Sequence, residues 1–289
     1  MKKILITGVN SYVGTAFENY VKQFDCYKVE TLDMQNPDWK NYSFEGYDVV
    51  FHVAGIAHSD MGKISDERKQ LYYTVNTELA IDTAIKAKNE GVKQFIFMSS
   101  ASVYGESAPI GKKKVITKDT PFHPSNVYGD SKVLAEKSIS KLQSESFNVV
   151  VLRPPMIYGK NCKGNYPTLS KLALKIPVFP AVDNERSMLY IGNLTEFIKL
   201  MIDNDEQGVF FPQNREYTNT CEIVKIIREV NGKKMRLVKG FSWALKIMSK
   251  FTGMVNKAFG NLSYDMSLSE YKVDYHKYTL RESIELTEK

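Results

Sequence analysis

The sequence predicts an α/β fold built on a doubly wound parallel sheet. Over the first 155 residues, short apolar runs alternate with segments of helical spacing. The apolar runs are continuous and β-branched rather than alternating, which indicates strands buried on both faces of a sheet. The repeated strand–helix–strand order favours parallel strands joined by right-handed crossovers.

The expected elements follow this order along the chain. Strands are predicted at residues 2–7, 27–32, 48–54, 92–98 and 148–152. Helices are predicted at residues 12–24, 66–89 and 125–146. Residues 1–155 are therefore expected to form the sheet domain.

After residue 155 the pattern loosens, and helical stretches at 168–174, 193–203 and 220–230 alternate with loops. We expect residues 156–289 to form a smaller, mostly helical cap that is interleaved with the sheet domain. Residues 156–240 are also expected to add later strands to the sheet. Residues 241–259 place aromatic and aliphatic side chains at helical spacing opposite three lysines. Packing of that apolar face onto the domain is favoured over contact with a membrane surface.

Composition narrows the class of protein. A chain of 289 residues with 43% hydrophobic and 25% charged residues is typical of a globular protein with a substantial core. No apolar run approaches the ~20 residues that span a bilayer, and the stretch after Lys3 is too short for a signal peptide. Three well-separated cysteines do not suggest a disulfide framework, so a cytoplasmic location is expected.

The net charge of +6 is spread along the chain. The lysine cluster at residues 112–114 is interpreted as a solvated loop rather than a nucleic-acid patch. A modest positive balance suits an anionic small-molecule ligand. The four histidines and three cysteines show no metal-ligand spacing, and His52 is interpreted as a satisfied core residue within a strand.

A glycine-containing loop, TGVNSYVG, joins the first strand to the first helix. Gly8 is expected to make the tight turn and Gly14 to let the helix pack close to the strand, while N–H groups at the helix start hold a pyrophosphate. A simple strand-to-helix turn is the alternative. The cofactor-binding candidates in this loop are Gly8, Asn10, Ser11, Tyr12, Val13 and Gly14.

Asp33 ends the second predicted strand. A carboxylate at this point can accept hydrogen bonds from the adenine ribose hydroxyls and would repel a 2′-phosphate. No arginine lies nearby in the sequence to compensate. The sequence therefore favours NAD over NADP as the cofactor.

Tyr128 and Lys132 lie one helical turn apart at the start of a predicted helix. The lysine charge is expected to lower the pKa of the tyrosine, so that the phenol moves a proton near neutral pH. The spacing alone means little, but the pair follows the fourth strand, which ends in a run of serines. Those hydroxyls lie at the carboxyl edge of the sheet, where α/β folds bind ligands.

The segments TGVNSYVG, HVAG, SSASVYG, YGDSK and LRPPMIYG occur in this order. Over roughly residues 1–200 the chain resembles the extended short-chain dehydrogenase/reductase family, in its nucleotide-sugar epimerase/dehydratase branch. The resemblance implies a Rossmann-type, NAD-binding domain over residues 1–155 and a substrate-binding cap over residues 156–289. It also adds cofactor-binding candidates: Val53, Ala54, Gly55, Asn76, Tyr128, Lys132 and Pro155.

The resemblance further implies a catalytic site of Ser100, Tyr128 and Lys132. Tyr128 would take the proton from a sugar hydroxyl, Lys132 would hold the nicotinamide ribose, and Ser100 would orient the sugar oxygen. Ser100 is preferred to Ser99 because it matches the family's S-x-x-V-Y-G pattern. Ser100 and Tyr128 would also bind substrate, and two further substrate-binding candidates lie in the cap: Asn165 and Arg186, the latter expected at the diphosphate.

Two departures from the family pattern affect the expected function. Ser11 replaces the middle glycine of the usual cofactor loop, and Ala101–Ser102 stand where sugar 4,6-dehydratases place Asp-Glu, which argues against a dehydratase. The expected activity is 4-epimerisation of a nucleotide-diphosphate hexose, most simply UDP-linked. A 4-keto-sugar reductase for surface polysaccharide precursors and a non-catalytic NAD-binding regulator remain alternatives. A homodimer is expected by analogy with the family.

Overall fold

A computed structural model describes residues 1–56, 64–240 and 259–289. The helix expected at residues 241–259 lies almost wholly outside the described residues. The chain divides into two compact units. The first comprises Met1–Gly105, Pro121–Pro154 and Leu194–Pro212, and the second comprises Glu106–Thr120, Pro155–Asn193 and Gln213–Lys289.

The first unit is built on a six-stranded sheet whose strands all run parallel, in the order β10-β6-β4-β3-β1-β2. Its strands are β1 (Lys2–Thr7), β2 (Tyr27–Leu32), β3 (Val49–His52), β4 (Gln94–Met98), β6 (Asn148–Leu152) and β10 (Gly208–Phe210). Continuous burial along β3, β4 and β6 follows from helices on both faces of the sheet.

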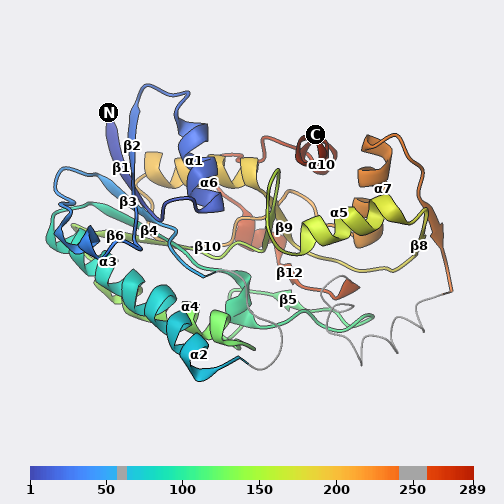
Figure 1. The fold of residues 1–289 in the computed structure, drawn as a ribbon, viewed down its shortest axis with the longest axis horizontal. Helices are drawn as coiled ribbons and strands as arrows, with labels where there is room; N and C mark the ends of the chain where they lie inside the picture. The colour runs from blue at the N-terminus through green and yellow to red at the C-terminus, as the bar shows by residue number, and fades with distance from the viewer. Residues whose placement is uncertain (57–63, 241–258) are drawn as a thin grey trace. The chain divides into compact units, whose positions relative to one another are not determined.

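Helices cover both faces of this sheet, as Figure 1 shows. On one face lie α1 (Tyr12–Val21) and α6 (Ile191–Asp203), and on the other lie α2 (Asp66–Tyr73), α3 (Leu79–Asn89) and α4 (Val127–Ile139). The core beneath α3 and α4 is a buried cluster that includes Val50, Phe95, Ala84 and Ala135. The predicted doubly wound α/β fold is confirmed.

The first unit departs from the expected boundaries where local geometry ends an element. The strand predicted to run to residue 54 stops at His52, because the N–H groups of Val53 and Ala54 both donate to the carbonyl oxygen of Thr7. The helix predicted at 66–89 is interrupted by a π-helical turn, η2 (Thr74–Glu78), between α2 and α3. The helix predicted at 125–146 ends at Ile139 and continues only as a short 3-10 turn, η4 (Ser140–Leu142). Two further 3-10 turns are η1 (Pro37–Asn41) and η3 (Ala101–Tyr104).

The second unit combines short parallel strand pairs with helices. The pairs are β7 (Met156–Tyr158) with β9 (Met188–Tyr190), β8 (Val178–Pro180) with β11 (Arg236–Val238), and β5 (Val115–Ile116) with β12 (Ser263–Tyr264). The helices are α5 (Asn165–Lys175), α7 (Thr220–Val230) and α10 (Leu280–Glu288), with a 3-10 turn, η5 (Met266–Ser269). α7 contacts both α5 and α10.

Within the described ranges, we find no helix that is both long enough and apolar enough to span a membrane.

Candidate active site

The turn after β1 and the first turn of α1 each require a glycine. Gly8 has a φ of +133°, and a Cβ atom built on it would lie 2.7 Å from the backbone nitrogen of Ala54. A Cβ atom on Gly14 would lie 3.0 Å from side-chain carbons of both Ile6 and Val53. The first glycine therefore permits the turn against the end of β3, and the second lets α1 approach the sheet closely.

The start of α1 is open to an anion. Ser11 is the N-cap residue but its side chain makes no capping hydrogen bond, and its buried hydroxyl has no partner among the described residues. Unsatisfied N–H groups and the helix dipole make such an end favourable for a phosphate. Asn10, in the preceding turn, has a φ of 59°. The loop, the missing Cβ atoms and the unpaired hydroxyl together fit the pyrophosphate of a dinucleotide.

Asn76 fixes the segment that follows β3. Its side-chain oxygen accepts a hydrogen bond from the N–H of Ile56 at 2.8 Å, and its amide donates to the Ile56 carbonyl at 3.2 Å and to the Ser131 hydroxyl at 3.1 Å. Asn76 is fully buried and lies in the π-helical turn, a feature frequent at functional sites. Gly55 lies beside it, because a Cβ atom there would be 3.0 Å from the Asn76 oxygen and 3.4 Å from Nζ of Lys132.

Tyr128 and Ser100 come together where η3 meets the first turn of α4. The Ser100 side chain acts on the Tyr128 phenol and lowers its pKa, while the Ser100 hydroxyl donates to the Ser102 hydroxyl at 3.1 Å. The close approach depends on Gly129, since a Cβ atom there would lie 2.5 Å from the carbonyl oxygen of Ser102. Ser99 points elsewhere, because its buried hydroxyl donates to Glu136 on α4.

The expected effect of Lys132 on Tyr128 is wrong in this structure. Burial raises the pKa of the Tyr128 phenol, the side chain of Ser100 lowers it, and Tyr72 raises it further, so the net shift is upward. The spacing gave one helical turn between the two residues but not the direction of the ammonium group. Lys132 donates to the carbonyl oxygen of Met98 at 2.9 Å, and its Nζ lies 4.7 Å from the centre of the Phe97 ring.

Lys132 is 5% exposed, and burial lowers its pKa to about 8, although the nearby carboxylate of Glu136 opposes this shift. An amine with this pKa carries its charge at neutral pH and loses it as the pH rises above the pKa. Lys132 can therefore donate to a hydroxyl of a bound ligand at neutral pH.

His52 is fully buried at the end of β3, where it lies against Thr7 and stacks on Phe95 and Phe97. Its Nδ1 is 2.8 Å from the Thr7 hydroxyl, but its Nε2 has no hydrogen-bond partner within the described part of the chain. The interpretation of His52 as a satisfied core residue therefore holds for one ring nitrogen only. Burial, helped by the charge of Lys132, lowers the pKa of His52 to about 3.

The His52 environment makes folding stability pH-dependent. The unfolded chain takes up a proton near pH 6.5, whereas the folded chain does so only near pH 3, so protonation favours unfolding between these values. We expect His52 to lower the free energy of unfolding by about 1.4 kcal/mol for each pH unit below its unfolded value. Urea unfolding of the wild type and His52→Asn from pH 4 to 7 measures this, with exposed His123→Asn as control. A stability difference between wild type and His52→Asn that stays constant with pH would contradict the expectation.

One charged residue of the site, Glu136, is absent from the sequence-based predictions. Glu136 is 2% exposed and forms an ion pair with Arg153, which follows β6. Glu136 stands one turn beyond Lys132 on α4, so its spacing from Lys132 was the available signal. Its pairing with a strand-end arginine depends on the fold.

The remaining predicted residues are placed as follows. In the first unit, Tyr12 and Val13 open α1, and Asp33 is exposed after β2, where it accepts a hydrogen bond from the N–H of Gln35 at 2.9 Å. In the second unit, Pro155 is the first residue after the sheet segment, and Asn165 is exposed at the start of α5.

Arg186 also belongs to the second unit, where its backbone pairs with that of Thr218. Burial lowers the pKa of its guanidinium to about 10. An anion in contact with this group would offset that cost.

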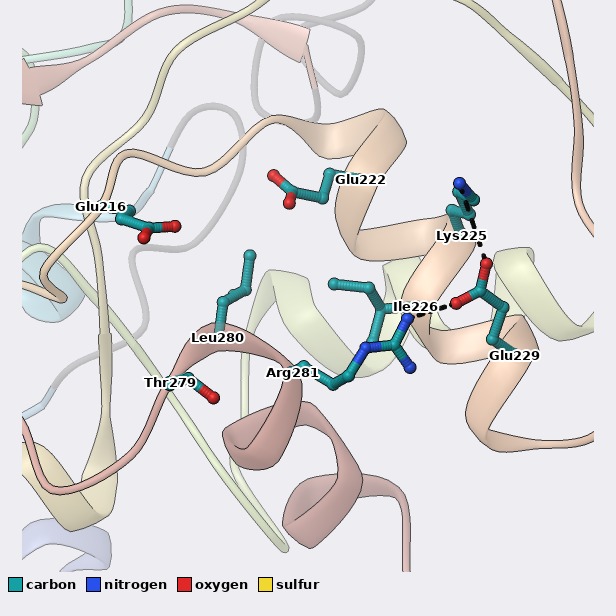
Figure 2. A pocket seen from close by; sticks show the side chains of 8 residues that line it. All are labelled: Glu216, Glu222, Lys225, Ile226, Glu229, Thr279, Leu280 and Arg281. Atoms are coloured by element: carbon teal, nitrogen blue, oxygen red, sulfur yellow. Dashed lines mark hydrogen bonds and ion pairs between the residues drawn. The ribbon is translucent and has the colours of Figure 1, made fainter.

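A separate hollow lies between α7 and the start of α10 (Figure 2). Three of its five charged side chains are engaged with one another, since Glu229 pairs with both Arg281 and Lys225. None of the sequence-predicted site residues lines it. Among the described residues, no group of three or more His, Cys, Asp or Glu side chains could hold a metal ion.

The fold and the first-unit site define a class of protein: an α/β protein with a tight glycine turn after β1 and with Ser100, Tyr128 and Lys132 gathered where η3 meets α4. Comparison with known proteins identifies the class further. The chain belongs to the NAD dependent epimerase/dehydratase family, whose model matches residues 4–211. This match confirms the family and the NAD cofactor expected from the sequence.

Three relatives show the extent of the similarity. A UDP-glucose 4-epimerase of Vibrio cholerae is 30% identical over 291 residues, covering 92% of this chain and 88% of the relative. An N-acetyl-alpha-D-glucosaminyl-diphospho-ditrans,octacis-undecaprenol 4-epimerase of Escherichia coli O157:H7 is 27% identical over 279 residues, covering 86% and 81%. The structure of a UDP-glucuronic acid 4-epimerase from Bacillus cereus in complex with NAD has a TM-score of 0.75 at 18% identity, covering 99% of this chain and 97% of the other.

Proposed function

We propose that this protein is an NAD-dependent nucleotide-sugar epimerase that acts at C4 of a UDP-linked hexose. The observation that carries the proposal is the contact of η3 with the start of α4, which brings Ser100 and Tyr128 together one helical turn from Lys132 at the carboxyl edge of the sheet. The Vibrio cholerae relative, aligned over most of both chains, supports the choice of reaction and sugar.

The residues take complementary roles in this proposal. Gly8, Gly14 and the start of α1 hold the pyrophosphate, and the Asp33 carboxylate receives the adenine ribose. Bound NAD supplies the hydride acceptor and donor for the sugar carbon. Tyr128 takes the proton of the 4-hydroxyl and later returns one, while Ser100 orients the same oxygen and Lys132 holds the nicotinamide ribose.

The two units have different roles in the proposal. The first unit binds the cofactor, and the second contributes sugar contacts through Asn165 and a cation for the diphosphate through Arg186. We also propose a cytoplasmic homodimer formed by the helices over one face of the sheet. Large apolar side chains are exposed on each of them: Leu71 on α2, Ile85 on α3 and Leu134 on α4, each 40–41% exposed.

A substrate screen tests the proposed activity. Purified protein is given UDP-, dTDP- and GDP-hexoses, and a polyprenyl-diphosphate-linked N-acetylhexosamine, with and without added NAD. Sugar products and absorbance at 340 nm are recorded. The proposal predicts interconversion of UDP-glucose and UDP-galactose without net change in absorbance, since the cofactor is regenerated in each turnover.

Other outcomes of the screen contradict the proposal. Stoichiometric consumption of NADH or NADPH with a 4-keto sugar would identify a reductase. Binding of NAD with no turnover of any sugar would identify a non-catalytic protein. Turnover of the polyprenyl-linked sugar alone would move the activity to a lipid-linked substrate.

A further inference from the structure

Glu136 connects three elements of the first unit. From α4, its carboxylate accepts hydrogen bonds from the Ser99 hydroxyl at the end of β4 and from the Arg153 guanidinium after β6. The Arg153 Nε lies 3.0 and 3.2 Å from the two carboxylate oxygens. Glu136 is therefore bonded at both oxygens and fixed in a buried position.

Arg153 extends this connection to η3. Its Nη1 donates to the Tyr104 hydroxyl at 2.6 Å, and its guanidinium lies 4.7 Å from the centre of the Phe122 ring. η3 begins immediately after Ser100, and Ala101 donates its N–H to the Pro154 carbonyl at 2.9 Å. The Glu136–Arg153 pair thus joins the segments on either side of Ser100 to the helix that carries Tyr128 and Lys132.

The pair is poorly explained by stability alone. Removing two charges from water costs about as much as their attraction returns, and an apolar pair of similar volume is often at least as stabilising. A buried pair with its remaining hydrogen-bonding groups satisfied by Ser99 and Tyr104 instead imposes one geometry on the elements it joins.

The pair also contributes charge near the site. Glu136 raises the pKa of Lys132 against the opposing effect of burial. The other titratable or charged groups around these two residues are His52 from β3, Arg153 after β6, Tyr104 from η3 and Tyr128 on α4 itself.

We infer that Glu136 and Arg153 are positioning residues, which act through Ser99, η3 and α4 to hold Ser100, Tyr128 and Lys132 in their reactive arrangement. This inference rests on the proposed function. Neither residue is proposed to touch substrate or cofactor.

The first experiment replaces the carboxylate by an amide of the same shape, Glu136→Gln. We expect kcat to fall by about 10- to 100-fold with little change in KM, because displaced catalytic groups lower turnover more than binding. Lys132 is also expected to titrate at lower pH, since the carboxylate no longer raises its pKa. The titration is followed by NMR on protein whose lysines carry ¹³C at the carbon next to Nζ, so it requires no turnover. The Lys132 signal is identified as the one that is missing from Lys132→Arg.

The second experiment separates positioning from stability. Glu136→Gln leaves Arg153 buried without its partner, whereas Glu136→Gln with Arg153→Met removes both charges and is expected to recover much of the lost stability. We expect kcat and the Lys132 titration to stay altered in the double variant. Glu90→Gln is the matched control, because it removes a half-buried ion pair with Lys86 on α3 and should leave both readouts unchanged.

Recovery of kcat together with stability in the double variant would overturn the inference, as would an unshifted Lys132 titration in either folded variant. If Glu136→Gln does not fold, the double variant decides alone. If the wild type turns over no sugar, the proposed function fails, whereas the Lys132 titration still tests what the pair does.

Discussion

Tyr128→Phe is expected to reduce kcat for the interconverted sugar by about 10²- to 10⁴-fold, the range of a lost general acid–base. The phenol stands at the start of α4, where Ser100 lowers its pKa, and phenylalanine keeps the ring while removing the transferable proton. Cofactor binding should survive, because Gly8, Gly14 and the start of α1 lie on other elements. Turnover is measured by product analysis, and bound NAD is measured after release from denatured protein.

Tyr42→Phe is the control for loss of a tyrosine hydroxyl. The Tyr42 hydroxyl donates to Glu30 at 3.0 Å in the same unit, and its loss should leave kcat unchanged. Full activity in Tyr128→Phe would refute the proposed role of Tyr128. Loss of bound NAD together with activity would show that the substitution disturbs the cofactor site instead.

The sheet could be predicted from the sequence because its signals are local. The β1, β2 and β6 boundaries match the expected strands residue for residue, since each contains β-branched or other apolar residues at strand spacing and is bounded by polar or turn residues. The interruption by η2 could not be predicted, because residues 66–89 keep a helical pattern through the π-helical turn. Only the partners of Asn76, two of them on Ile56 and one on Ser131, reveal why the helix changes there.

The electrostatics of the site depend on contacts between side chains that the spacing of residues in the sequence does not predict. Glu136 and Arg153 are charged residues 17 positions apart, and composition alone would place both in solvent. Parallel crossover topology brings α4 over the end of β6 and pairs them in the interior. The direction of the Lys132 ammonium, toward Met98 and Phe97, likewise follows from the packed strand end.

Gly8→Ala is expected to destabilise the protein by about 3 kcal/mol or more, because it combines a strained backbone with a steric overlap. At a φ of +133° the new Cβ would lie 2.7 Å from the Ala54 nitrogen, which is itself fixed by its hydrogen bond to Thr7 at 2.8 Å. Neither backbone segment can move without breaking the β1–β3 pairing. Urea unfolding of the wild type and variant measures the loss.

Gly46→Ala separates the two causes, because Gly46 also has a positive φ, +78°, but a Cβ atom there would meet no atom within 4 Å. Its cost should be limited to backbone strain, about 1–2 kcal/mol. A Gly8→Ala variant no less stable than Gly46→Ala would mean that the β1 turn can relax away from Ala54. In that case Gly8 would be required for the close approach of a pyrophosphate rather than for packing against the end of β3. Gly8→Ala would then lower the affinity for NAD without a matching loss of stability.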